Sequence, residues 1–181
     1  ERYSCNEVFD FLKKRKGLIE AVTVSGGEPC LQKGLKDFIF EVKKMGYLVK
    51  LDTNGSRPEV IKDLMANELI DYIAMDIKTS FKNYYELVPE QNIKEKIRKS
   101  VNLILSSDID YCFRTTAAPY FVSESNLPDM LKEITGAKKY FIQKFTLENC
   151  LYPDFFKDLK KNNLDTLKFI AEKFVKSVEV I

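Results

Sequence analysis

The sequence predicts an α/β fold built around a parallel sheet. Short apolar segments rich in β-branched residues alternate with segments whose apolar residues recur at helical spacing. No linker, repeat or low-complexity stretch interrupts this series, so the 181 residues are expected to form a single domain, 1–181. Because a helix between two strands returns the chain to the same edge, successive strands should run parallel. A doubly wound sheet and a partial barrel both fit this pattern.

The first helix is predicted from Ser4, which is followed three residues later by Glu7 in a capping-box pattern. The segment 21–24 then predicts a short buried strand that runs directly into a pair of glycines. Ser56 and Glu59 repeat the capping-box spacing before a later helix. The other expected helices are 35–45, 92–105, 127–134 and 164–175, and the other expected strands are 47–51, 72–77, 111–117, 140–145 and a short edge strand at 178–181.

Composition and charge exclude several classes of function. Hydrophobic residues make up 45% of the chain and charged residues 31%, which is typical of a globular domain. The net charge is only +2 and the lysines are scattered among acidic residues, so no basic surface for nucleic acid is expected. No apolar run is long enough to span a membrane and no signal peptide opens the sequence. We therefore expect a cytoplasmic protein with no nucleic-acid or membrane partner.

The cysteines form no metal-binding motif. Cys5, Cys30, Cys112 and Cys150 are far apart, no two form a CxxC pair, and the chain has no histidine. Free thiols are therefore expected, and no metal ligand is assigned to any residue of this chain.

Unusual polar residues or glycines end each of the first three predicted strands, and the fourth and fifth strands carry polar residues among their apolar ones. The glycines at 26–27 precede an acidic residue and a proline, the next strand ends in 52–55, and the following strands carry further charged or amide side chains. Because the carboxyl ends of parallel strands meet at one rim, these sets should converge on one ligand site. The candidate binding residues are Gly26, Gly27, Glu28, Pro29, Asp52, Thr53, Asn54, Asp76, Lys78, Arg114 and Gln143.

These residue types suit a zwitterionic, hydroxylated ligand. Asp52 and Asp76 can accept hydrogen bonds from ammonium or hydroxyl groups, and Lys78 and Arg114 can pair with a carboxylate. Two structural alternatives stay open. Asp76 and Lys78 share one face of a strand and can neutralise each other, and Arg114 can form an internal ion pair that holds the sheet together.

The motifs Gly26–Pro29 (GGEP), Asp52–Gly55 (DTNG) and Asp76–Lys78 (DIK), in this order, resemble the radical S-adenosylmethionine activating enzymes of glycyl radical enzymes. Within that family, the runs 113–116 (FRTT) and 143–145 (QKF) look most like activating proteins of the anaerobic ribonucleoside-triphosphate reductase. The resemblance covers nearly the whole chain. It implies an α/β fold of the partial (β/α)6, TIM-like barrel type, with S-adenosylmethionine bound at the strand ends.

Carried over by position, the resemblance implies that Gly26, Gly27 and Glu28 hold the methionyl amino group. Asp52, Thr53 and Asn54 would line the same pocket, and Asp76 and Lys78 would contact the carboxylate and ribose. In the family, a 4Fe-4S cluster gives one electron to the sulfonium, and the resulting deoxyadenosyl radical takes a hydrogen atom from a glycine of the partner. The implied partners are a glycyl radical enzyme and an electron donor such as flavodoxin or ferredoxin.

The sequence departs from the family at the cluster. The family's Cys-x3-Cys-x2-Cys loop follows its first strand, and no such loop is present here. The segment 21–24 matches the family's second strand, so the barrel is expected to lack its first βα unit, roughly thirty residues. No catalytic residue is therefore assigned to this chain, and the complete protein would carry the cluster. A cluster-less binding module for S-adenosylmethionine or a nucleotide, and a phosphate-binding barrel enzyme, are the alternatives.

Overall fold

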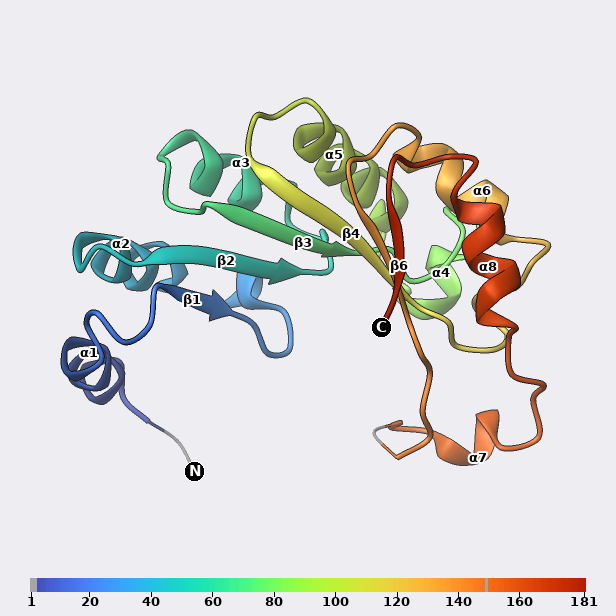
Figure 1. Cartoon of the computed structure of the whole chain (residues 1–181), viewed down its shortest axis with the longest axis horizontal. Helices are drawn as coiled ribbons and strands as arrows, with labels where there is room; N and C mark the ends of the chain where they lie inside the picture. Colours follow the sequence, from blue (N-terminus) through green and yellow to red (C-terminus); the bar gives the residue numbers. More distant parts are fainter. Residues whose placement is uncertain (1–2, 149) are drawn as a thin grey trace.

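A computed structural model describes residues 3–148 and 150–181 and has a curved, six-stranded parallel sheet at its centre (Figure 1). The strands are adjacent in chain order, from β1 to β6. Every pairing between neighbouring strands is parallel. The strands are β1 (Ala21–Val24), β2 (Leu48–Thr53), β3 (Tyr72–Asp76), β4 (Asp110–Thr116), β5 (Tyr140–Gln143) and β6 (Val178–Val180).

The main connecting helices lie along the outer, convex side of this sheet (Figure 1). Strand order never reverses, which excludes a doubly wound sheet, where the order switches direction. The predicted partial barrel is therefore confirmed, and among the described residues β1 and β6 each pair on one side only. The helices are α1 (Cys5–Lys14), α2 (Leu35–Lys44), α3 (Pro58–Ala66), α4 (Tyr84–Leu87), α5 (Ile93–Leu105), α6 (Leu127–Leu131), α7 (Pro153–Phe156) and α8 (Leu164–Ala171), with 3₁₀ turns η1 (Pro29–Leu31) and η2 (Lys132–Ile134).

Strand β2 shows how the two faces of the sheet differ. Val49, Leu51 and Thr53 are buried on the face that packs against the helices. Lys50 and Asp52 alternate with them and so lie on the concave face. The hydrophobic core is therefore the layer between sheet and helices, and the concave face is left for polar side chains.

Local signals were correct at some helix ends and wrong at others. The Ser4–Glu7 capping box is present, with the Glu7 amide donating to Ser4 Oγ at 3.3 Å. The capping box predicted for Ser56 is wrong, because α3 begins at Pro58 and Arg57 is its N-cap. The Ser56 amide instead donates to Asn54 Oδ1 at 2.9 Å, which ties it into the turn that follows β2. The short helices α4 and α7 were not predicted.

No helix among residues 3–148 and 150–181 is both long enough and apolar enough to cross a membrane.

Gly55 provides a test of the packing beneath the strand ends. Its φ is +76°, and a Cβ at this position would lie 2.1 Å from Met75 Cε. Gly55→Ala should therefore lower the free energy of unfolding by about 2–4 kcal/mol, from backbone strain and overpacking together. Gly136→Ala is the matched control: its φ is +82° with no atom within 4 Å, so only the strain of about 1–2 kcal/mol applies. Urea unfolding of both variants measures the difference, and equal losses would contradict the role of Met75.

Candidate functional site

The turn after β1 combines two left-handed glycines with a buried carboxylate. Gly26 has φ +98° and Gly27 has φ +54°, conformations that side chains larger than glycine rarely adopt. Glu28 then returns to extended backbone and is the N-cap of η1, where its side chain accepts from the Cys30 amide. The glycines thus form an open backbone turn at the carboxyl end of β1.

The Glu28 carboxylate fastens this turn to the end of β2. Its side chain is buried, and Oε1 accepts from Thr53 Oγ1 at 2.7 Å while Oε2 accepts from the Asn54 amide at 2.6 Å. Thr53 Oγ1 also accepts from the Gly55 amide at 3.1 Å. Both Glu28 oxygens are therefore used inside the protein, and the Glu28 side chain positions the loops.

Strand register brings the charged residues of β2, β3 and β4 together on the concave face. Asp76 of β3 lies beside Arg114 of β4, and Asp52 of β2 is beside Ala74, two residues earlier in β3. Arg114 donates from Nε to Asp76 Oδ1 at 2.9 Å and from Nη1 to Asp52 Oδ2 at 3.0 Å. One guanidinium thus joins two acidic strand ends.

Two lysines complete the network. Lys50 Nζ lies 2.8 Å from Asp52 Oδ1 as an ion pair, although the geometry is not that of a hydrogen bond. Lys78 donates to Asp76 Oδ2 at 3.2 Å, and its side chain is 51% exposed. Three cations therefore surround two carboxylates, and Lys78, the most exposed of the three, is the cation best placed for a ligand's negative charge.

Both structural alternatives for these residues are present in the structure. Asp76 pairs with Lys78, and Arg114 forms an internal ion-pair bridge. Burial by itself raises the pKa of Asp52, but the positive charges of Lys50 and Arg114 and the hydrogen bond from Arg114 outweigh it and lower that pKa below its usual value. The Asp52 carboxylate is thus held ionised beside the cavity described next.

A cavity of about 100 Å³ opens where these strand ends meet, and we call it the strand-end cavity. It brings together most of the predicted site residues, with Gly26, Glu28 and Pro29 placed in the adjoining turn. Gln143 does not line it. The lining residues are Ser25, Gly27, Asp52, Thr53, Asn54, Asp76, Lys78 and Arg114.

A larger hollow of about 340 Å³, the lumen cavity, lies on the same concave face and contains Gln143. It shares Arg114 with the strand-end cavity and includes Lys50, which sequence reasoning missed. The sequence did contain a signal for Lys50. It lies two residues before Asp52 on the same strand, with the buried Leu51 between them, and residues two apart on a strand share a face. The remaining lining residues are Tyr72, Cys112, Phe141 and Ile181.

Cys30 is adjacent to the glycine turn but does not line either cavity. The side chain is buried, and its Sγ lies 3.7 Å from Thr53 Oγ1. Burial, followed by the negative charge of Glu28, raises the pKa of the Cys30 thiol to about 12. The thiol is therefore protonated at neutral pH. Within residues 3–148 and 150–181, no three His, Cys, Asp or Glu side chains are grouped so as to hold a metal ion.

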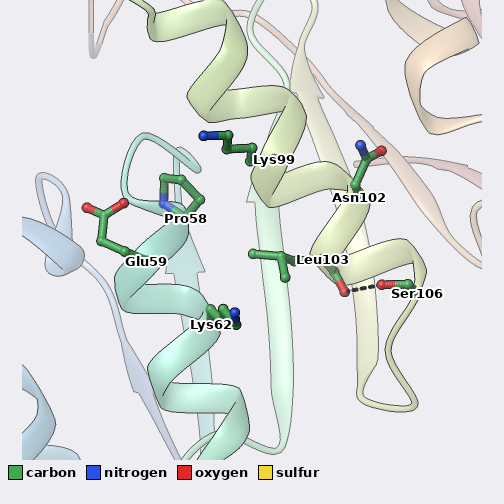
Figure 2. A pocket seen from close by; sticks show the side chains of 7 residues that line it. All are labelled: Pro58, Glu59, Lys62, Lys99, Asn102, Leu103 and Ser106. Atoms are coloured by element: carbon green, nitrogen blue, oxygen red, sulfur yellow. Dashed lines mark hydrogen bonds between the residues drawn. The ribbon is translucent and has the colours of Figure 1, made fainter.

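A still larger hollow, about 450 Å³, is a groove between α3 and α5 (Figure 2). Pro58, Glu59 and Lys62 border it from α3, and Lys99, Asn102 and Leu103 border it from α5. It lies in the outer helical layer, so none of the charged strand ends reaches it. The concave face is the better candidate site because it combines paired charges with an open glycine backbone.

Comparison with known proteins identifies relatives of this chain. The family model described as the radical SAM superfamily matches residues 4–134. A Methanocaldococcus jannaschii protein that carries the name glycyl-radical enzyme activating enzyme is 38% identical over 172 residues, which is 89% of this chain and 70% of that protein. A Thermococcus kodakarensis 7-carboxy-7-deazaguanine synthase is 38% identical over 68 residues, 37% of this chain and 26% of its own length.

Solved structures support the fold assignment. A domain of the pyruvate-formate lyase-activating enzyme from Bacteroides vulgatus superposes with a TM-score of 0.67 at 16% identity, covering 90% of this chain and 99% of that domain. Streptococcus suis SuiB superposes with a TM-score of 0.72 at 12% identity, covering all of this chain and 44% of SuiB. At these identities the likeness concerns the fold alone.

The ion-pair network predicts a specific dependence of stability on pH. The unfolded chain should give Asp52 its usual pKa of 3.8, and the folded chain lowers it. The Asp52 carboxylate thus stabilises the fold above pH 3.8, and this contribution is lost as pH falls through the lower folded pKa. Denaturant unfolding should find Asp52→Asn clearly less stable than wild type at neutral pH and nearly equal to it at the acid limit. A difference that does not change with pH would contradict the network.

Proposed function

The chain belongs to the radical SAM superfamily, and we propose that it binds S-adenosylmethionine at the strand-end cavity as part of an enzyme that generates a glycyl radical on a partner protein. The observation that carries this proposal is the pairing of opposite charges beside an open glycine turn. A zwitterionic methionyl group needs a cation, a carboxylate and backbone acceptors within a small volume. The residues around the strand-end cavity offer all three.

Each predicted residue has a proposed role toward this ligand. The backbone of Gly26 and Gly27 would accept from the amino group, while Glu28 and Pro29 fix the turn that presents it. Lys78 would pair with the carboxylate, and Asp76 and Asp52 would hold Lys78 and Arg114 in place or accept from ribose hydroxyls. Thr53 and Asn54 support the cavity wall. Gln143 would contact the ligand or the reacting segment of the partner from the lumen cavity.

S-adenosylmethionine would supply, after one-electron reduction, the radical that removes a hydrogen atom from a glycine of the partner. This chain's own residues would bind and orient the sulfonium and shield it within the concave face. The 4Fe-4S cluster that the family implies does not fit the thiols described here, because no three Cys, His, Asp or Glu side chains of residues 3–148 and 150–181 are grouped so as to hold a metal. The described residues are therefore assigned to binding of S-adenosylmethionine alone.

The proposed partner is an anaerobic ribonucleoside-triphosphate reductase, and a flavodoxin or ferredoxin is the proposed electron donor. The runs 113–116 and 143–145 support this choice, because they resemble activating proteins of that reductase. They contain Arg114 and Gln143, which lie on the concave face. The related M. jannaschii protein supports the broader class of activating enzyme. A cytoplasmic location is proposed because this chemistry uses soluble reductants.

The function is tested by electron paramagnetic resonance. The complete protein, reduced anaerobically with S-adenosylmethionine and the reductase, should produce a glycyl radical signal on the reductase together with deoxyadenosine. Omission of S-adenosylmethionine should abolish both products. Deoxyadenosine without a protein radical would indicate a different substrate, and neither product would contradict the proposal.

Lys78→Ala tests the binding site directly. Loss of this charged contact should weaken S-adenosylmethionine binding to the complete protein by about 1–3 kcal/mol, measured by isothermal titration calorimetry. Lys82→Ala is the matched control, because Lys82 is an exposed lysine four residues away that pairs with Asp129 and lines none of the cavities near the strand ends. Unchanged affinity in Lys78→Ala would mean that Lys78 only neutralises Asp76.

A further inference from the structure

A cluster of aromatic side chains lies beside the strand ends, and we call it the aromatic shelf. Its members contact one another with ring centroids 4.8–6.4 Å apart. They come from the connection after β4, residues 117–126, and the connection after β5, residues 144–163. Two of the rings are strongly exposed, Tyr120 at 60% and Phe155 at 50%. The members of the shelf are Tyr120, Phe121, Phe145, Phe155 and Phe156.

The shelf is fixed in place. Asn162 Nδ2 donates to the carbonyl oxygens of Ala117 and Val122, at 3.1 and 2.9 Å, and so joins the two connections. Thr79 Oγ1 donates to the carbonyl of Phe121 at 2.9 Å, which fastens the shelf to the segment following β3. These hydrogen bonds therefore hold in place the backbone segments that carry the exposed rings.

The shelf continues directly into the candidate site. Phe121 forms the wall of a cavity of about 130 Å³ together with Asp76, Lys78 and Thr116. Asp76 and Lys78 also line the strand-end cavity. Phe121 thus connects the charged site to the exposed aromatic rings outside it.

From this continuity we propose that the aromatic shelf is the docking surface for the protein substrate, the polypeptide whose reacting segment enters the concave face. The inference rests on the proposed function. Exposed aromatic rings supply most of the binding energy at many protein interfaces, and two rings of the shelf, Tyr120 and Phe155, are exposed beside the candidate site. Additional exposed side chains on the connection after β5, Leu151 and Tyr152, extend the apolar area.

The surrounding charges favour a polypeptide over a lipid surface. The connection carries charges of both signs: Lys144, Lys157, Lys160 and Lys161 are interspersed with Glu148, Asp154 and Asp158. Asp154 and Lys157 pair at 3.2 Å. A membrane-binding surface combines aromatic rings with an excess of basic residues, whereas protein interfaces have a mixed polar rim around an apolar centre.

The test compares Phe155→Ala with Phe169→Ala. Phe169 is a matched control because it is 63% exposed on α8 and belongs to no shelf contact. Surface plasmon resonance with the anaerobic ribonucleoside-triphosphate reductase of the same organism should show a Kd raised about tenfold or more by Phe155→Ala. Phe169→Ala should change Kd by less than about twofold. Both variants should bind S-adenosylmethionine as wild type does.

Hydrogen exchange of the wild-type complex supplies a second measurement that needs no variant. The reductase should slow exchange in residues 117–126 and 144–163 and leave α3 unchanged. Equal reductase affinity for Phe155→Ala and wild type would overturn the shelf assignment and leave the proposed function standing. A wild-type protein that binds S-adenosylmethionine but no reductase would overturn the proposed partner and the docking surface together. Protection of the shelf by a second copy of this chain, or binding to neutral lipid vesicles, would also overturn it.

Discussion

The Arg114 guanidinium is the interaction on which the candidate site depends. Asp52 and Asp76 lie on neighbouring strands, and two carboxylates this close would repel each other without a cation between them. Arg114 donates to both, at 3.0 and 2.9 Å, and so allows acidic side chains to converge on the concave face. All three residues lie at or just before the carboxyl ends of their strands. The two ion pairs of Arg114 therefore also hold β2, β3 and β4 in register there.

The buried Glu28 carboxylate is the second interaction on which the site depends. Glu28 uses both carboxylate oxygens to fasten the turn after β1 to the turn after β2. Because these bonds satisfy Glu28 and Thr53 internally, they position the loops, while the glycine backbone and the half-exposed ammonium of Lys78 face the ligand. The paired polar groups thus make the ligand site rigid, and Lys78 stays accessible although it pairs with Asp76. A binding site whose groups are already held in place orients its ligand before the reaction.

Most of the fold could be predicted from the sequence, and the site only in part. Apolar periodicity located the strands because each has a face buried against helices, as Val49 and Leu51 do. The sequence also predicted which residues meet at the site, because parallel strands end at one rim. These are residues 26–28, 52–54, 76, 78 and 114. Contacts such as Arg114 with Asp52, and the presence of Lys50 beside them, depend on register between strands, which local sequence does not encode. Likewise α4 and α7 are too short for their periodicity to be seen.

The most direct test of the account is a nuclear magnetic resonance titration of the 181-residue chain with S-adenosylmethionine to millimolar concentration. The account predicts that the largest chemical-shift changes occur at the backbone amides of Gly26, Gly27, Asn54 and Lys78, around the strand-end cavity. Changes centred on the groove between α3 and α5, or a spectrum that stays unchanged up to millimolar S-adenosylmethionine, would contradict the assignment of the strand ends as the binding site.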